Sequence, residues 1–120
     1  MTSRFTVFVV ADYQAPYPDP IQAKAGDIVV LHPEKKTDIQ GWVWCSNSAG
    51  KSGWVPTKYI AAGGDRGKIL HDYNAIELTV RVGETLTVHR EESNFYWVEN
   101  QKGQQGWVPV GNVERLKANQ

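Results

Sequence analysis

Apolar and polar residues alternate along much of this chain with the two-residue period of β-strands. At residues 78–82 every second position is apolar, and after a turn at 83–84 the alternation resumes as far as residue 88. This pattern predicts a ribbon with one face on a core. Residues 28–31 form a continuous apolar run, and no stretch keeps helical spacing for three turns. The sequence therefore predicts an all-β protein made of short strands.

Several short motifs occur twice in the same order: Asp-Tyr at 12–13 and 72–73, glycine followed by an acid at 26–27 and 83–84, and Gly-Trp-Val-Pro at 53–56 and 106–109. Self-similarity at roughly 55 to 60 residues indicates two small domains in tandem. About five short strands in each would close best as a partly open barrel, because closure hides the strand edges. We expect domain 1 at residues 1–61, a short linker at 62–67 and domain 2 at 68–120.

Charge and cysteine content narrow the classes of function. The chain has 13 Lys and Arg against 13 Asp and Glu, so it lacks the basic footprint of proteins that bind nucleic acid or anionic membranes. Cys45 is the only cysteine, which excludes an intrachain disulfide and gives no sign of an oxidising compartment. No run of about 18 apolar residues occurs, and residues 1–10 show no cleavage-site pattern. We expect a soluble, cytoplasmic protein.

Four segments of the repeat together resemble the Src-homology-3 (SH3) domain. Residues 10–13 and 70–73 resemble its Ala-Leu-Tyr-Asp-Tyr signature, residues 77–80 with 83–84 its Glu-Leu-Ser-Phe run and Gly-Asp turn, residues 42–44 and 95–97 its paired-tryptophan segment, and residues 53–60 its Gly-Tyr-Ile-Pro-Ser-Asn-Tyr-Val close. The resemblance covers nearly the whole chain twice and implies two tandem SH3-like, five-stranded barrels. The Trp-rich first copy, with Asp19-Pro20 in its long first loop, is most similar to the variant SH3 domains of prokaryotes.

The resemblance implies a protein that docks proline-rich peptides. A polyproline II segment is already ordered, so aromatic side chains can hold it with little loss of entropy. Trp42 would flank the specificity pocket, and nearby acids would pair with a ligand Arg or Lys. Carried over from the family, the peptide-binding positions of the first copy are Tyr13, Asp19, Glu34, Asp38, Trp42, Trp54, Pro56 and Tyr59. The groove candidates of the second repeat are His71, Tyr73, Glu77, Phe95, Trp107 and Pro109.

Both copies depart from the family pattern at groove positions. The first copy has Ala11 where the family has its first tyrosine, and Lys58 where it has an asparagine that binds the ligand backbone. Each lost contact would weaken binding by about 1 kcal/mol or more. The second copy departs further, with His71 for the first tyrosine, Phe95 for the ridge tryptophan, Gly111 for the asparagine and Asn112 for the closing tyrosine. We therefore expect the first copy to be the main peptide-binding domain.

The segment from Trp42 to Cys45 leaves open which side chains face the core. Strand alternation places Trp42 and Trp44 on one face and Val43 and Cys45 on the other. Because the family position aligned with Cys45 faces inward, we expect exposed tryptophans, and the alternative is that the second copy or a second chain covers them. Cys45 is interpreted as a small buried hydrophobe, since no histidine lies at a spacing that would activate it.

The leading interpretation is a non-catalytic adaptor or regulatory module for a protein or peptide partner, either proline-containing or otherwise extended. One alternative is a structural unit in which the two barrels pack together, or form a homodimer, and occlude the groove. Binding of cell-wall peptide or of nucleic acid are further alternatives. Residues 15–20, with three prolines, predict a stiff loop or a segment that itself docks into an aromatic groove. We expect no enzyme, metal, cofactor, nucleic-acid or membrane partner, because the sequence shows no paired carboxylates, activated nucleophile or phosphate-cradling loop.

Overall fold

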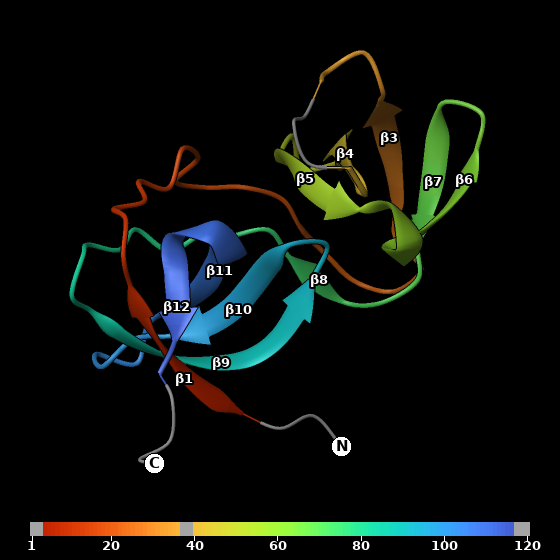
Figure 1. Cartoon of the computed structure of the whole chain (residues 1–120). Helices are drawn as coiled ribbons and strands as arrows, with labels where there is room; N and C mark the ends of the chain where they lie inside the picture. The colour runs from red at the N-terminus through yellow and green to blue at the C-terminus, as the bar shows by residue number, and fades with distance from the viewer. Residues whose placement is uncertain (1–3, 37–39, 117–120) are drawn as a thin grey trace. The chain divides into compact units, whose positions relative to one another are not determined.

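The chain folds into two compact β-units, seen in a computed structural model that describes residues 4–36 and 40–116. Unit 1 consists of residues 1–16 and 77–120, and unit 2 of residues 17–76. The strands form one five-stranded sheet in each unit and a further two-stranded sheet (Figure 1). The described residues contain two short 3-10 helices and no α-helix. The predicted fold class, all-β with two SH3-like barrels, is confirmed.

Unit 1 is built from one N-terminal strand and the C-terminal third of the chain. Its sheet has the order β11-β10-β9-β1-β12, and every pairing in it is antiparallel. Figure 1 shows the red strand β1 lying among the blue and teal strands of the C-terminal part. The elements of unit 1 are β1 (Phe5–Val9), β9 (Thr85–Glu92), β10 (Phe95–Glu99), β11 (Gln105–Pro109), η2 (Val110–Asn112) and β12 (Val113–Arg115).

Unit 2 is a contiguous segment whose sheet has the order β5-β4-β3-β7-β6. A separate antiparallel pair, β2 with β8, joins the start of the unit to its end. The elements of unit 2 are β2 (Gln22–Ala23), β3 (Ile28–His32), β4 (Trp42–Ser46), β5 (Ser52–Pro56), η1 (Thr57–Tyr59), β6 (Ile60–Gly63), β7 (Arg66–Ile69) and β8 (Tyr73–Asn74).

The two sequence repeats have exchanged their first strands. Strand β1, from the first repeat, pairs with β9 and β12 of the second repeat. Strand β7, which is the equivalent strand of the second repeat, pairs with β3 and β6 of the first. The exchange extends into the following loops, where Tyr13 pairs with Val80 and Ala23 pairs with Tyr73. Each barrel therefore contains the first strand of one repeat and the remaining strands of the other.

Residues 62–67, expected as a linker between the repeats, lie in strands β6 and β7 and the turn between them, and this local structure also explains the exchange. Strands β6 and β7 form a hairpin closed by the two-residue turn 64–65, in which Gly64 has a φ of 68°. A glycine-bearing two-residue turn favours direct pairing of the strands it joins. Closing this short loop costs far less chain entropy than pairing strands separated by a whole repeat. The boundaries 1–61 and 68–120 thus delimit sequence repeats, whereas the compact units divide at other positions.

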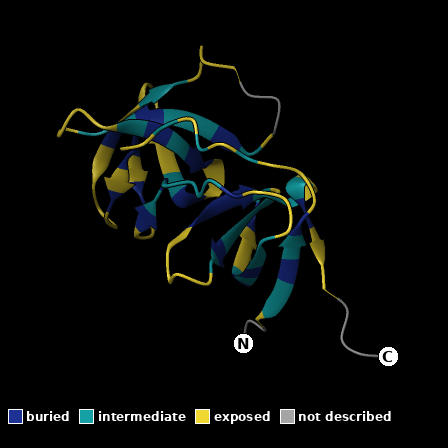
Figure 2. Ribbon diagram, turned by 90° about the vertical axis from the view of Figure 1, so that its left-hand side faces the viewer, coloured by how far each residue is buried: buried dark blue, intermediate teal, exposed yellow. Residues whose placement is uncertain are grey.

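Each unit has its own apolar core, and Figure 2 shows buried bands alternating with less buried ones along the strands. The core cluster of unit 1 is Val7, Val9, Val80, Leu86, Val88, Val98, Val108 and Val113. The buried apolar residues of unit 2 are Ile21, Ala23, Val29, Trp42, Cys45, Val55, Tyr59, Ile69, Tyr73 and Ala75. The prediction that Cys45 is a buried hydrophobe is confirmed, because its side chain is 0% exposed.

The expected ribbon over residues 78–88 forms only in part. Leu86 and Val88 are buried on strand β9 as predicted, and Val80 is also fully buried. Leu78 is half-buried, however, and Val82 is 62% exposed, so the three apolar residues do not share one buried face. The reason is that residues 77–82 form no strand and make only isolated bridges, Glu77 with Trp107 and Val80 with Tyr13, so strand alternation does not set which side chains are buried there.

Candidate peptide-binding surface

The hairpin of β4 and β5 and the helix η1 place the first group of aromatic residues in unit 2. Trp42 lies opposite Pro56 in the register of the two strands, and Trp44 lies opposite Trp54. Pro56 also precedes η1, which carries Tyr59. The amide of Thr57 donates to the carbonyl of Gly41 at 2.8 Å and fixes the end of β5 beside the start of β4. The close of one repeat thus holds a tryptophan, a proline and a tyrosine in a rigid frame.

The second group of aromatic residues comes from the other repeat. The ring of Tyr59 lies 5.4 Å from that of His71 and 5.6 Å from that of Tyr73, both edge to face. The hydroxyl of Tyr73 donates to the carbonyl of Trp54 at 2.8 Å. Strand β8 positions Tyr73 by pairing it with Ala23. We call the five residues Trp42, Pro56, Tyr59, His71 and Tyr73 the composite surface, because the two repeats build it together.

Most of the composite surface is closely packed. Trp42 and Tyr59 are each 9% exposed and Tyr73 is 5% exposed, whereas His71 is exposed. The expectation of an exposed Trp42 is therefore wrong, although its neighbour Trp44 is only half-buried. The strand pairing sets Trp42 opposite Pro56, which is also buried.

A further aromatic group, separate from the composite surface, lies along the same hairpin of β4 and β5. The ring of Tyr17 lies 4.9 Å from that of Trp44, and Trp44 lies 5.1 Å from Trp54 with the planes at 75°. The ammonium of Lys35 lies 4.6 Å from the centre of the Trp44 ring and 5.9 Å from that of Trp54. We call Tyr17, Lys35, Trp44 and Trp54 the tryptophan patch. The proline-flanked Tyr17 thus contacts an aromatic ring of unit 2.

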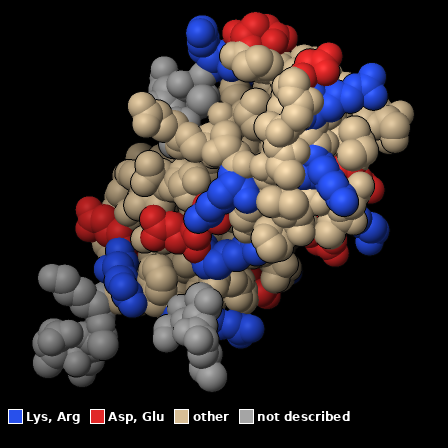
Figure 3. Space-filling model, turned by 90° about the vertical axis from the view of Figure 1, so that its right-hand side faces the viewer, with Lys and Arg blue, Asp and Glu red and all other residues tan. Residues whose placement is uncertain are grey.

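The acids expected to line the groove have partners in unit 2. Asp19 forms an ion pair with Lys51, and Glu34 lies 3.3 Å from His32. Asp38 falls outside the described residues. On the face shown in Figure 3, acidic and basic side chains are interspersed, without a large area of one sign. Each described acid of the predicted wall therefore already has a partner within unit 2.

The equivalent region of unit 1 has a different chemistry. The hydroxyl of Tyr13 donates to the carboxylate of Glu77, so Tyr13 joins the second repeat and not Trp42 or Tyr59 as expected. Asn112, at the position equivalent to Tyr59, donates to the carbonyls of Ala11 and Asp12 at 3.1 and 3.0 Å. The amide of Asn112 thus binds backbone where unit 2 presents a tyrosine ring.

Unit 1 keeps its aromatic residues on the equivalent hairpin. Phe95 lies opposite Pro109, as Trp42 lies opposite Pro56. The ring of Trp97 lies 5.2 Å from that of Trp107, which is only 1% exposed, and the guanidinium of Arg90 lies 5.3 Å from the Trp107 ring. The same edge-to-face tryptophan pair therefore occurs in both units, but unit 1 buries one ring of its pair.

Three side chains have a shifted pKa. Burial raises the pKa of the Cys45 thiol to about 12, which keeps it protonated and unreactive. Burial also raises the pKa of Glu77, partly offset by the hydrogen bond from Tyr13. Hydrogen bonds from Gln105 and His89 lower the pKa of Glu99. Within residues 4–36 and 40–116, no group of three His, Cys, Asp or Glu side chains is arranged to hold a metal ion.

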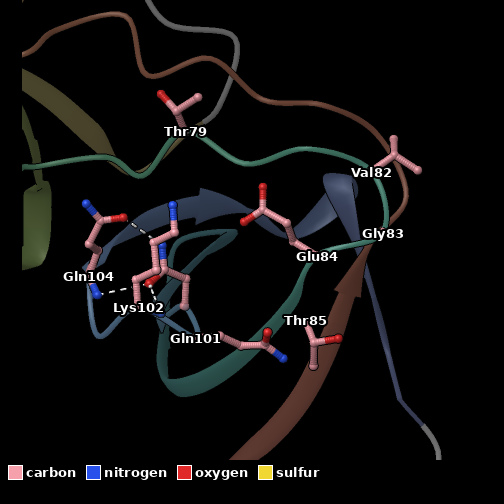
Figure 4. Close-up of a pocket in the computed structure, with 9 residues that line it drawn as sticks. Thr79, Val82, Gly83, Glu84, Thr85, Gln101, Lys102 and Gln104 are labelled. Atoms are coloured by element: carbon pink, nitrogen blue, oxygen red, sulfur yellow. Dashed lines mark hydrogen bonds between the residues drawn. The ribbon is translucent and has the colours of Figure 1, made fainter.

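An open, polar hollow in unit 1 lies away from these aromatic residues. Figure 4 shows the side chain of Glu84 on one side and those of Gln101 and Lys102 on another. Glu84 accepts a hydrogen bond from the amide of Arg81 at 2.7 Å, so its carboxylate is already engaged. The hollow is lined by Thr79, Val82, Gly83, Glu84, Thr85, Asn100, Gln101, Lys102 and Gln104. It contains none of the predicted site residues.

The structure sorts the predicted site residues differently from the sequence repeats. Asp19, Glu34, Trp42, Trp54, Pro56 and Tyr59 lie in unit 2 together with His71 and Tyr73 of the second repeat, whereas Tyr13 lies in unit 1 with Glu77, Phe95, Trp107 and Pro109. Sequence reasoning missed the position of Lys35 over two rings and the backbone contacts of Asn112. The departure at Asn112 was visible in the sequence, but nothing there indicated a partner for Lys35.

Comparison with known proteins gives a family and two relatives. The model of the variant SH3 domain matches residues 7–62 and again residues 66–116. Myosin heavy chain IB of Acanthamoeba castellanii is 38% identical over 52 residues, which cover 41% of this chain and 4% of that protein. The SH2/SH3 adapter protein dreadlocks of Drosophila melanogaster is 26% identical over 133 aligned positions, which cover 92% of this chain and 24% of that protein. No helix among the described residues is long and apolar enough to cross a membrane.

Proposed function

This chain belongs to the variant SH3 domain family, and from that premise we propose that it is a non-catalytic interaction module for a proline-containing or otherwise extended peptide. SH3 domains are in general interaction modules that bind protein or peptide partners. The proposed site is the composite surface of unit 2. The observation that carries the proposal is the meeting of Tyr59 with His71 and Tyr73 beside the Trp42 and Pro56 pair.

The physical argument rests on preorganisation. Rings that contact one another edge to face cannot reorient freely, so a peptide that binds them orders few new side chains. A polyproline II segment is equally preordered, which limits the entropy lost on its side. His71 is exposed whereas Tyr59 is only 9% exposed, so the peptide would meet His71 first.

Unit 1 supports the same function less well. At the positions equivalent to His71 and Tyr59, unit 1 has Ala11 and Asn112, and neither has an aromatic ring. The side-chain amide of Asn112 donates to the carbonyls of Ala11 and Asp12. Phe95 and Pro109 remain as contact residues. We therefore assign the main binding role to unit 2, whose residues come from both repeats.

The test is a pair of matched substitutions at equivalent positions. His71→Ala removes an exposed ring from the composite surface and should weaken binding of a proline-rich peptide about fivefold, which corresponds to ~1 kcal/mol. Ala11→His adds the same ring to unit 1 and should leave the affinity of unit 2 unchanged. Binding would be followed by two-dimensional amide NMR, with the 5 tryptophan indole signals as reporters. The opposite result, a gain from Ala11→His and no loss from His71→Ala, would contradict the assignment to unit 2.

A structural role is the second candidate, and the low exposure of three composite residues favours it. Trp42, Tyr59 and Tyr73 are each exposed by 9% or less, which is what an occluded groove requires. In that case the indole signals would stay in place with millimolar peptide, and a neutral quencher would reduce the fluorescence of Trp42 very little. Saturable shifts of the Trp42 and Trp54 signals would instead support peptide binding.

A further inference from the structure

We infer that the peptide held by unit 2 carries an acidic side chain beside its prolines, and that Lys35 over the tryptophan patch binds this acid. The inference rests on the proposed function and names the charge of its ligand. It is opposite to the basic ligand that the sequence predicts from Asp19, Glu34 and Asp38. The observations that carry it are the position of Lys35 and the partners of the neighbouring acids.

Lys35 is held where a ligand would pass. Its ammonium lies within 6 Å of two ring centres, Trp44 at 4.6 Å and Trp54 at 5.9 Å, which is the range of a cation–π contact. Trp54 also connects this patch to the composite surface, because its carbonyl accepts the hydroxyl of Tyr73. Lys35 itself is exposed, so the ring contacts leave room for a carboxylate on the solvent side of the ammonium.

The acids around the patch are engaged by other groups of unit 2. Asp19, on the segment of Tyr17, pairs with Lys51. Glu34, next to Lys35 in the chain, lies 3.3 Å from His32. Asp72, which follows His71, accepts a hydrogen bond from the amide of Ala25 at 2.9 Å. A ligand arginine would meet carboxylates whose charge is already shared with these partners, and it would also approach the charge of Lys35.

A ligand carboxylate would instead be attracted by the positive charge of Lys35. It would form a charge-assisted hydrogen bond with an ammonium that the two rings already orient, so little further side-chain freedom is lost. Lys36 is exposed beside Lys35 and adds a second positive charge at the same end of the surface. Like-charge contact with an arginine at that end would lower affinity, and it would be screened by salt in the same way as the attraction of the acid.

The experiment compares three peptides that share one proline core. Each has the sequence Ala-Pro-Pro-Val-Pro flanked at both ends by Glu, Gln or Arg, and each is titrated into the full chain while amide NMR signals are recorded. We expect the Glu peptide to bind about tenfold more tightly than the Arg peptide at low salt, with the ratio shrinking at high salt. Lys35→Glu should reverse the order, whereas Lys35→Gln should remove it.

Two matched controls locate the effect. Lys36→Gln removes an adjacent charge that contacts neither ring and should change the ratio by less than half as much as Lys35→Gln does. Asp38→Asn removes the remaining acid of the predicted wall and should leave the order of the peptides unchanged. Tighter binding of the Arg peptide, or equal binding of all three, would overturn the inference and leave the proposed function standing. Absence of binding by every peptide would overturn both.

Discussion

Units 1 and 2 close the same kind of barrel with different side chains. The core cluster of unit 1 is entirely aliphatic, with Leu86 as its one residue other than valine, and Trp107 is the one aromatic side chain that is buried among the described residues of this unit. Unit 2 buries smaller residues such as Ala23, Ala75 and Cys45, and fills the remaining volume with Trp42, Tyr59 and Tyr73. Large aromatic residues contribute much apolar area per residue, which a small domain with few core positions needs. Unit 2 therefore uses as core the side chains that the family uses for ligand binding.

The exchange of first strands produces this contrast. Without it, Ala11 and Tyr13 would lie beside Tyr59, and His71 and Tyr73 would lie beside Asn112, so the barrel that contains Tyr59 would lose the ring of His71. With it, His71 and Tyr73 join Tyr59 in unit 2. Repeats of similar sequence thus present different side chains at equivalent positions, with His71, Tyr73 and Tyr59 together in unit 2 and Ala11, Tyr13 and Asn112 together in unit 1.

The largest effect is expected from a disulfide that only exchanged barrels can form. Thr6 lies opposite Thr87 in the pairing of β1 with β9. Thr6→Cys with Thr87→Cys, in a Cys45→Ala background, should therefore oxidise almost completely within one chain, since directly paired strand residues have the separation that a disulfide needs. Peptide mapping by mass spectrometry of the monomeric fraction would detect the cross-link.

The matched control for the disulfide is Thr6→Cys with Val30→Cys. Val30 holds the position in unit 2 that Thr87 holds in unit 1, because it pairs with Arg66 as Thr87 pairs with Thr6. This pair would form a cross-link only if each repeat folded with its own first strand. A cross-link in the control and none in the first variant would remove the basis for the contrast between the units.

A smaller effect is expected from the glycines of the repeated Gly-Trp-Val-Pro motif. A Cβ atom at Gly106 would lie 2.8 Å from the amide nitrogen of Leu78 and 3.0 Å from the carbonyl carbon of Glu77. Backbone atoms cannot move aside cheaply, so Gly106→Ala should lower the free energy of unfolding of unit 1 by about 1–3 kcal/mol. Urea denaturation followed by tryptophan fluorescence would measure the loss.

Gly53→Ala is the control for that substitution in unit 2. Its Cβ would meet the side chains of Ile21 and Ala75 at 3.0 and 3.1 Å and the amide nitrogen of Ile21 at 3.3 Å, so a shift of a few tenths of an ångström would relieve the contacts. We expect a loss of about 1 kcal/mol or less, at the low end of overpacking costs. Equal losses at the two glycines would argue that the loops of the two units are held with the same rigidity.

The smallest effect concerns the pH dependence of unit 1. Because burial raises the pKa of Glu77, the folded unit binds this proton more tightly than the unfolded chain does. The stabilisation is complete below the ordinary pKa of 4.5 and is lost as the pH rises through the raised pKa of the folded state. Glu77→Gln should remove this loss, which we expect to be under about 1 kcal/mol because the group is partly open to solvent.

Thermal unfolding of the wild type and Glu77→Gln between pH 4 and 7 would test the sign of the effect. Glu91→Gln, at an exposed site, serves as the control and should leave the pH dependence unchanged. Near the position equivalent to Glu77, unit 2 has Pro20, which has no ionisable side chain. The unfolding transition of unit 2 should therefore not respond to the Glu77 substitution. A wild type that gains stability relative to Glu77→Gln as the pH rises would show that the hydrogen bond from Tyr13 outweighs burial.

The fold was largely predictable because its signals are local. The alternation around Leu86 and Val88, the inward position of Cys45 and the repeated Gly-Trp-Val-Pro motif each depend on a few neighbouring residues. The site was less predictable because it depends on pairing at long range. Tyr13 and Tyr73 occupy equivalent positions in the two repeats, and no local pattern indicates which barrel each one joins.

The sequence pattern also could not predict how exposed each tryptophan is. Period-two alternation places Trp42 and Trp44 on one face, and the pairings Trp42 with Pro56 and Trp44 with Trp54 agree with this. Burial of Trp42 depends on what covers that face, and the position of Lys35 depends on how a loop returns over it. Both follow from side-chain packing between segments that are separate in the sequence.

The sequence by itself determined that this protein consists of two similar five-stranded barrels, because strand period, turn glycines and the repeat are encoded residue by residue. Only the tertiary structure decided which first strand completes which barrel. The backbone hydrogen bonds of a strand pair are the same whichever repeat supplies the strand, so pattern alone cannot distinguish the two connections. The two-residue turn at Gly64 and Asp65 decides between them, because it pairs β6 directly with β7 and leaves β1 to complete the other unit.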